Sequence, residues 1–181
     1  MKVIAVRHGQ SIGNVKGIIQ GHTHGTLTAK GRAQARLAAR RLKSFRFDAI
    51  YSSDLRRARM TAMEIVKFHR YTDTLYVKEL RERSFGVLEG RMAREIAPNG
   101  TSKEFWHRLR PLNGESHAQL RRRLAAFIRL LKKRHRNETV LFVTHGVVMQ
   151  ALMAISKNRP ASHMKRIRTP GNAALRFLEY K

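Results

Sequence analysis

Short apolar runs recur along the chain and are typical of strands that are covered on both faces. The first occupies residues 2–6, and the run TVLFV occupies residues 139–143. Less regular runs at 47–51, 74–77 and 174–180 predict three further strands. Continuous apolar runs of this length fit a sheet buried between two layers better than a sheet with one face in water.

Between these runs, apolar residues recur every three or four positions, which indicates amphipathic helices. The segments with this pattern are residues 28–43, about 54–68, 116–135 and 146–156. In the third segment Leu120, Leu124 and Leu131 fall on one helical face. Thr28 stands where a side-chain oxygen can cap the first segment.

The predicted strands alternate with the predicted helices, an order that is typical of an α/β domain with a largely parallel sheet. We therefore expect a three-layer sandwich in which helices flank a mostly parallel central sheet. A length of 181 residues is enough for a substantial core, so residues 1–181 are expected to form a single domain.

Basic residues and histidines follow three of the predicted strands. The tripeptide Arg-His-Gly at 7–9 follows the first strand, and the pair His145-Gly146 follows TVLFV. The segment SSDLRR at 52–57 follows another strand. In sheets of this kind, ligands bind beyond the carboxyl ends of the strands. Arginine and histidine gathered there predict an anion site, and phosphate is the anion that a bidentate arginine fits well.

The charge of the chain is strongly positive, because 38 Lys+Arg stand against 12 Asp+Glu and give a formal net charge of +26. Three interpretations stay open: a dedicated polyanion partner, a solvated basic surface without a partner, and a deliberately altered surface. The basic residues are spread over the chain rather than gathered in a tail. We therefore expect at least nonspecific attraction of polyanions, while the oligomeric state stays open.

The chain contains no cysteine, which excludes thiolate nucleophiles, disulfides and zinc–thiolate sites. No apolar run reaches the roughly 18 residues that a membrane span needs. The apolar stretch near the N-terminus is too short for a secretory signal. We therefore expect a cytoplasmic protein.

Cleavage of a phosphate ester needs fixed donors for the phosphoryl oxygens, a nucleophile, and a proton for the leaving oxygen. Without cysteine, the nucleophile can be a histidine, serine, aspartate or threonine. His8 is the best-placed candidate, because it lies at a strand end between an arginine and a glycine. Neighbouring arginines would also keep its imidazole neutral, and hence nucleophilic, by like-charge repulsion.

The motif RHGQSIGN at 7–14 resembles the signature of the histidine phosphatase superfamily, which has the phosphoglycerate-mutase-like fold. Five further segments match in the same order: LTAKGRAQA (27–35), SSDLRRARMTA (52–62), LRERSFGVLEG (80–90), NGES (113–116) and VTHGVVMQAL (143–152). The resemblance covers nearly the whole chain and is closest to the small phosphatase branch. Ordered blocks at family spacing are far more specific than a lone Arg-His-Gly.

The resemblance implies three catalytic residues. His8 attacks phosphorus and becomes phosphohistidine, Glu82 protonates the leaving oxygen and later activates water, and His145 stabilises the phosphoryl group. The phosphate-binding residues that it implies are Arg7, Arg57, Asn14, Gly9 and Gly146. It implies no metal and no cofactor, since arginine and histidine provide the positive charge.

Residues from several blocks are candidates for the substrate pocket. These are Ser11, Phe105, Trp106, Glu115 and Asn172, with His107 and Arg110 beside them. Phe105 and Trp106 could instead form a hydrophobic clamp under their loop, and Glu115 could belong to the start of the helix at 116–135. We expect Glu89 to organise its loop through hydrogen bonds.

The chain departs from the family pattern at His24 and Thr26, where an aspartate and a proline are common. We interpret His22 and His24 as loop residues rather than metal ligands. The segment from Gly90 to Gly114 is short, whereas mutases of the family usually carry a longer insertion there. We therefore expect a phosphatase of broad specificity that acts on a small phosphorylated substrate. The alternatives are mutase-type phosphoryl transfer and a basic polyanion-binding module with weak phosphatase activity.

Overall fold

The computed structural model describes residues 1–97 and 103–181. Within these residues, five strands form one sheet in the order β3–β2–β4–β1–β5. The strands are β1 (Lys2–Arg7), β2 (Ala49–Ser53), β3 (Thr74–Val77), β4 (Thr139–Thr144) and β5 (Leu175–Glu179). The first four run parallel, and β5 pairs antiparallel with β1 at one edge. The prediction of a mostly parallel sheet is therefore confirmed.

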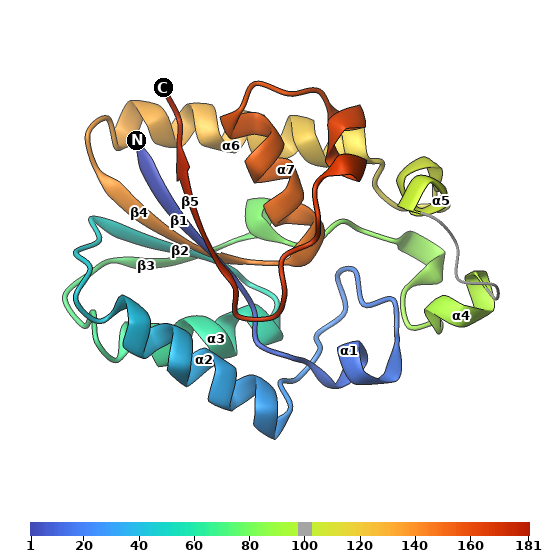
Figure 1. Ribbon diagram of the computed structural model, residues 1–181, viewed down its shortest axis with the longest axis horizontal. Helices are drawn as coiled ribbons and strands as arrows, with labels where there is room; N and C mark the ends of the chain where they lie inside the picture. Colours follow the sequence, from blue (N-terminus) through green and yellow to red (C-terminus); the bar gives the residue numbers. More distant parts are fainter. Residues whose placement is uncertain (98–102) are drawn as a thin grey trace.

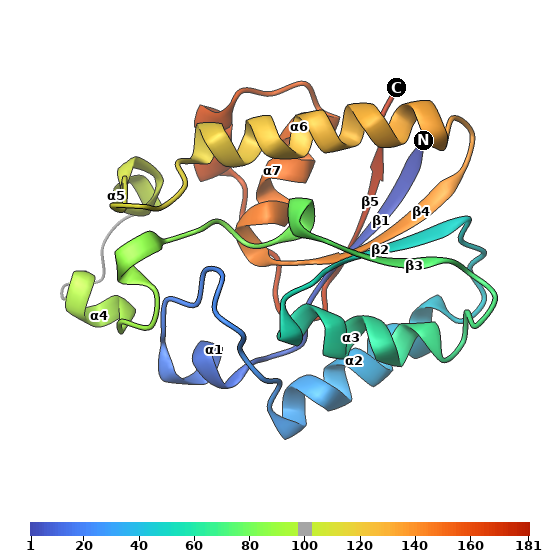
Figure 2. The same ribbon diagram turned by 180° about the vertical axis from the view of Figure 1, so that it is seen from behind.

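Helices cover both faces of the sheet. Figures 1 and 2 show α2 (Ala29–Leu42) and α3 (Arg56–Val66) on one face, and α6 (His117–Arg134) and α7 (Gly146–Ser156) on the other. The expected three-layer sandwich is thus the observed architecture.

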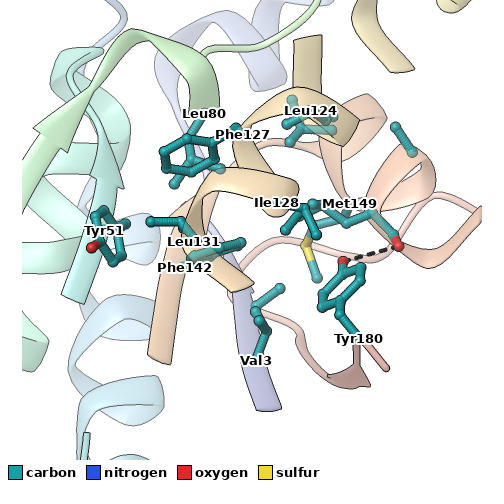
Figure 3. Close-up of a cluster of buried hydrophobic side chains, with 14 of the residues drawn as sticks. Val3, Tyr51, Leu80, Leu124, Phe127, Ile128, Leu131, Phe142, Met149 and Tyr180 are labelled. Atoms are coloured by element: carbon teal, nitrogen blue, oxygen red, sulfur yellow. Dashed lines mark hydrogen bonds between the residues drawn. The ribbon is translucent and has the colours of Figure 1, made fainter. Parts of the chain in front are cut away.

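Successive residues of the central strands pack into different layers. Ile4 and Leu141 belong to the core beneath α2 and α3, whereas Val3 and Phe142 belong to the core beneath α6 and α7. Figure 3 shows this second cluster, in which Phe142 lies beside side chains of α6. Because both faces are buried, the strands need apolar residues at every position, which explains the unbroken runs in the sequence.

The two longest helices begin where the sequence predicts a cap. The Thr28 side chain accepts the N–H of Gly31 at 2.9 Å, and the Ser116 side chain accepts the N–H of Gln119 at 3.1 Å. In contrast, β2 begins two residues later than predicted, at Ala49. The preceding residue, Asp48, uses its carboxylate to accept the N–H of Thr139 at 2.8 Å.

Several short elements were not predicted. They are α1 (Ile12–Lys16), α4 (Ala93–Ile96), α5 (Lys103–Arg108), and the 3₁₀ turns Lys78–Leu80, Gly86–Leu88 and Ala161–Arg166. Elements of this length give too little hydrophobic periodicity to detect. Figures 1 and 2 show α1, α4 and α5 beyond the end of the sheet at which the parallel strands finish. No helix among the described residues is long and apolar enough to cross a membrane.

Candidate active site

The loop after β1 is held tightly against its neighbours. The N–H of His8 donates to the carbonyl of Thr144 at 2.9 Å, which ties it to the end of β4. The N–H of Gly9 donates to Thr61 Oγ1 of α3 at 3.1 Å. A side chain at Gly9 would place its Cβ only 2.2 Å from the carbonyl oxygen of Gly31. Glycine is therefore required by close backbone packing, which fixes the ring of His8 at the strand end.

The ring of His8 is buried, with 2% of the residue exposed. Its Nδ1 lies 2.7 Å from the carbonyl oxygen of Gly9, so Nδ1 carries the proton and donates to that acceptor. Nε2 then holds a lone pair and has no hydrogen bond within the described residues. Burial, followed by the charges of Arg57 and Arg7, lowers the pKa of His8 well below 6.5. The imidazole is therefore neutral at physiological pH and presents a nucleophilic nitrogen.

A second imidazole lies beside the first. The rings of His8 and His145 have centroids 5.1 Å apart and are tilted by 59°. His145 is fully buried and its Nε2 lies 2.8 Å from Ser53 Oγ, while its buried Nδ1 has no partner among the described residues. Burial and the charge of Arg57 lower the pKa of His145 well below 6.5. The unpaired Nδ1 is thus free to contact a ligand.

Two arginines approach the same place from α3 and β1. Arg57 Nη1 and Nη2 donate to the carbonyls of Thr23 and Gly21 at 2.7 and 2.8 Å. Arg7 Nη1 donates to the carbonyl of Pro170 at 2.6 Å. The Nε atoms of both arginines are buried and unpaired among the described residues. Burial lowers the pKa of Arg57 to about 10, so the side chain keeps its charge.

Helix ends add to this positive field. α3 begins at Arg56, one residue before Arg57, and α7 begins directly after His145. The N-terminus of a helix carries a partial positive charge and unpaired N–H groups, and both favour an anion. Unpaired donors, two guanidinium groups and two helix ends therefore make an anion site in which charge is only partly balanced.

Glu82 is the carboxylate that faces these cations. Its Oε1 accepts the N–H of Arg83 at 3.0 Å, and its Oε2 accepts the N–H of Val147 in the first turn of α7 at 3.3 Å. Its charge acts on both Arg7 and Arg57, raising their pKa values against the effect of burial. Glu82 therefore lies beside the two buried arginines, where the predicted acid must stand to protonate a leaving oxygen.

The remaining predicted phosphate contacts lie around this centre. Asn172 Nδ2 donates to the carbonyl of His8 at 3.2 Å and to Asn14 Oδ1 at 3.1 Å, so the two asparagines bridge the loop after β1 and the approach to β5. At Gly146, an added Cβ would stand only 2.9 Å from Thr169 Cγ2 and 3.4 Å from Arg7 Cζ. Glycine at this position leaves room for the Thr169 side chain, with the Arg7 guanidinium close by.

Two predicted pocket residues contact other parts of the protein. Ser11 is fully buried and caps α1, accepting the N–H of Asn14 at 3.2 Å and donating to Gln20 Oε1 at 2.9 Å. The carboxylate of Glu115 is bound by Arg123 through two contacts of 3.0 and 2.8 Å. Both side chains have hydrogen-bond partners within the protein, which favours a role in loop structure, and their place in the substrate pocket stays a prediction.

Two other predictions concern side chains near the site. Glu89 Oε1 accepts the hydroxyl of Ser84 at 3.2 Å and the N–H of Phe85 at 2.9 Å, which confirms that it organises its loop. His22 lies in a loop, as predicted, and its side chain contacts the backbone of Glu82. Its Nε2 lies 2.9 Å from the carbonyl oxygen of Glu82, while His24 is exposed. Among the described residues, no group of three His, Asp or Glu side chains is placed to hold a metal.

Two residues that the sequence did not single out belong to the site's support. Ser53 Oγ contacts His145 and also accepts the N–H of Leu55 at 3.3 Å. Arg83, of which 1% is exposed, donates to the carbonyls of Glu115, Trp106 and Leu109. No sequence signal marks Ser53, because its role arises from the pairing of β2 with β4. Arg83 follows Glu82 directly, but its three acceptors are distant in the chain.

Comparison with known proteins gives a consistent match. The model of the histidine phosphatase superfamily (branch 1) matches residues 3–181. A metal-independent phosphoserine phosphatase from Arabidopsis thaliana is 37% identical over 158 residues, which are 83% of this chain and 66% of that protein. A probable phosphoglycerate mutase, GpmB, from Proteus mirabilis is 33% identical over an alignment that covers 100% of this chain and 86% of that protein.

The fold is shared with solved structures as well. A mycobacterial glucosyl-3-phosphoglycerate phosphatase, in complex with VO3, superposes with a TM-score of 0.90 at 27% identity, covering 98% of this chain and 90% of that one. The order of sequence motifs, the five-stranded sheet of the described residues and the two facing histidines agree with this match. The chain belongs to the histidine phosphatase superfamily, branch 1.

Proposed function

We propose that the chain hydrolyses small phosphomonoesters through a phosphohistidine on His8, without a metal ion. One observation carries the proposal: a neutral His8, with Nδ1 bound to the Gly9 carbonyl, presents Nε2 beside a second imidazole and two buried arginines. A lone pair held next to fixed positive donors suits attack on a phosphoryl group.

In the first step, His8 Nε2 forms a bond to phosphorus while the bond from phosphorus to the ester oxygen breaks. The leaving oxygen takes a proton from Glu82, which must enter the step as the carboxylic acid. Arg7, Arg57 and His145 hold the charge of the phosphoryl oxygens. Because Ser53 Oγ accepts the N–H of Leu55, its own proton can go to His145 Nε2. Nδ1 of His145 then carries the proton that points to substrate.

In the second step, a water molecule attacks phosphorus and the bond to His8 breaks. Glu82, now a carboxylate, takes the proton of that water, so the acid form is restored at the end of the cycle. Inorganic phosphate leaves, and His8 returns to the neutral state that its buried, positively charged surroundings favour. The cycle consumes one ester and one water.

Hydrolysis rather than mutase transfer is favoured by the short segment between Gly90 and Gly114. With little chain available to enclose the site, water can reach the phosphohistidine before an alcohol acceptor does. Phosphomonoesters of this size are mainly intracellular metabolites, and we propose the cytoplasm as the place of action.

The proposal is tested by hydrolysis of p-nitrophenyl phosphate in the presence of a chelator. We expect turnover that the chelator leaves unchanged, and loss of turnover by several orders of magnitude in His8→Ala. Turnover that needs an added metal, or His8→Ala at wild-type rate, would overturn it. Release of phosphate without formation of an isomeric ester separates a phosphatase from a mutase.

A second candidate function, polyanion binding, is favoured by the outer surface of α2. Arg32, Arg36 and Arg40 are exposed and spaced four residues apart, and no ion pair engages them within residues 1–97 and 103–181. Like charges at this spacing destabilise a helix slightly. If a polyanion binds there, affinity for single-stranded nucleic acid should fall steeply with salt and should weaken when the three arginines are replaced by glutamine.

A further inference from the structure

A cavity of about 260 Å³ is lined by two residues whose backbone N–H groups bind the carboxylate of Glu82. Val147, whose N–H binds Glu82 Oε2, and Arg83, whose N–H binds Glu82 Oε1, both line it. Thr169 also lines it and lies over Gly146, next to the Arg7 guanidinium. In the mechanism proposed above, Glu82 gives its proton to the leaving oxygen, which would direct the remainder of the leaving alcohol toward this cavity.

The wall of the cavity is largely apolar and aromatic. Phe85, Trp106 and Met164 contribute to it, and the rings of Phe85 and Trp106 meet edge to face with centroids 6.4 Å apart. Small-molecule sites usually measure about 300–1,000 Å³, so this cavity lies just below that range and fits a single ring rather than a disaccharide. Aromatic side chains favour a flat or apolar group over a hydrated one.

Both cations in the wall are already bound by the protein. The Arg83 guanidinium donates to three carbonyls at 2.5 to 2.9 Å, and its flat face lies over the ring of Phe85 at 5.0 Å. Lys165 Nζ pairs with the carboxylate of Glu104 at 2.6 Å. Arg110 is exposed and does not line the cavity. Among the residues that the structure describes, the wall of the cavity therefore offers no unengaged cation to a carboxylate on the leaving group.

The two histidines of the wall are uncharged. Their rings lie 4.4 Å apart, and the Nδ1 of His117 donates to the carbonyl of His107 at 3.1 Å. Burial and the charge of Arg83 lower the pKa of His117 to about 3, and burial also lowers the pKa of His107. Each can make a neutral hydrogen bond, but neither can pair with a carboxylate at neutral pH.

We propose that this cavity is the leaving-group site and that it selects phosphomonoesters of uncharged, single-ring or apolar alcohols against those of carboxylated alcohols. The proposal rests on the phosphatase function given above. It separates the preference of this chain from the phosphoserine and phosphoglycerate compounds in the names of its relatives.

The test compares kcat/KM for four alkyl phosphates whose leaving oxygens are chemically similar. These are 2-phenylethyl phosphate, its 4-carboxyphenyl analogue, O-phosphoserine and ethyl phosphate. We expect 2-phenylethyl phosphate to exceed both carboxylated compounds at least tenfold. Equal values, or a preference for either carboxylated ester, would overturn the proposal.

Variants locate the preference in the cavity. Trp106→Ala removes one aromatic wall but keeps the carbonyl that Arg83 uses. It should lower kcat/KM for 2-phenylethyl phosphate about tenfold and for ethyl phosphate less than threefold, since an ethyl group does not reach the wall. Phe177→Ala, at an aromatic position on β5 that is 65% exposed, is the matched control and should change neither. Equal losses on both esters in Trp106→Ala would contradict a leaving-group role.

A binding arm keeps this test separate from the phosphatase proposal. Calorimetry would compare 3-phenylpropylphosphonate with its 4-carboxyphenyl analogue, because phosphonates bind without being hydrolysed. Tighter binding of the uncharged phosphonate in a protein without turnover would support the cavity and reject the catalytic proposal. Turnover together with tighter binding of the carboxylated phosphonate would support the catalytic proposal and reject the proposed selectivity of the cavity.

Discussion

The imidazole rings of His8 and His145 lie 5.1 Å apart, and each uses one nitrogen inside the protein. His8 Nδ1 donates to a backbone carbonyl, whereas His145 Nε2 accepts the hydroxyl of Ser53. The opposite choice of nitrogen leaves Nε2 of the first ring and Nδ1 of the second for substrate. One ring is therefore set as a nucleophile and the other as a donor, and each tautomer is fixed by a neighbour that can be changed.

Ser53→Ala should impair catalysis without unfolding the protein. Without this hydroxyl, the buried Nε2 of His145 has no hydrogen-bond partner, and the ring proton can lie on either nitrogen. We expect this change to lower kcat about ten- to a hundredfold. KM should change less, because the arginines still bind phosphate. Ser52→Ala is the control, since Ser52 is equally buried and its hydroxyl donates only to the carbonyl of Ser53. Similar kinetics for the two variants would refute the role of Ser53.

The low pKa values of His8 and His145 should be visible by NMR. Burial and nearby arginine charge disfavour the protonated ring, so neither imidazole should titrate near 6.5 as the pH falls from 8 to 5. His8 should show the Nδ1–H tautomer.

Arg57→Gln then tests the cause of these shifts. Removing one positive charge should raise the pKa of both rings and move their titration toward higher pH. A midpoint near 6.5 for His8 in the unmodified protein, or no change in Arg57→Gln, is the outcome that this explanation does not allow.

Glu82→Gln should separate substrates by their leaving groups. A glutamine cannot donate the proton that an alkoxide needs, whereas p-nitrophenolate leaves readily without one. We expect at least a hundredfold loss of kcat/KM, which reports the first step alone, on alkyl phosphates and a much smaller loss of kcat/KM on p-nitrophenyl phosphate. Equal losses on both would mean that Glu82 acts through structure or charge alone.

His117 should make the fold sensitive to acid. Its pKa is about 3 in the folded chain and 6.5 in the unfolded chain, so the unfolded state binds more protons between these values. This contribution to the free energy of unfolding is fully present above pH 6.5 and is lost as the pH falls toward 3. The free energy of unfolding should therefore fall less steeply with falling pH in His117→Asn than in the wild type. The difference in slope should correspond to at most about one bound proton, and urea unfolding at pH 7, 5.5 and 4.5 measures it. An unchanged slope in His117→Asn would reject the prediction.

Much of the fold could be predicted because the sheet is buried on both sides. The apolar runs at β1 and β4, and the caps at Thr28 and Ser116, are local signals that the structure confirms. The antiparallel direction of β5 could not be read from its sequence, since strand direction depends on the path of the chain after α7. The short helices lacked enough residues to show a period.

The sequence could predict the position of those site residues that follow a strand directly. It could not predict the contacts of residues in the other loops. The motifs placed His8 and His145 in loops that parallel strands must bring together. The sequence alone could not decide the roles of Ser11 and Glu115, because a side chain in a motif can serve either the ligand or the loop. Their partners, Gln20 and Arg123, become visible only when the chain is folded.

The central claim is a covalent intermediate on His8, and rapid quenching with a ³²P-labelled substrate tests it most directly. The predicted result is a phosphoenzyme formed within one turnover, stable to base and labile to acid, with the label on the peptide that contains His8 and absent from His8→Ala. In Glu82→Gln, labelled with p-nitrophenyl phosphate, the intermediate should accumulate because water is no longer activated. Turnover by wild type with no trapped label, or label that persists in His8→Ala, would contradict the account.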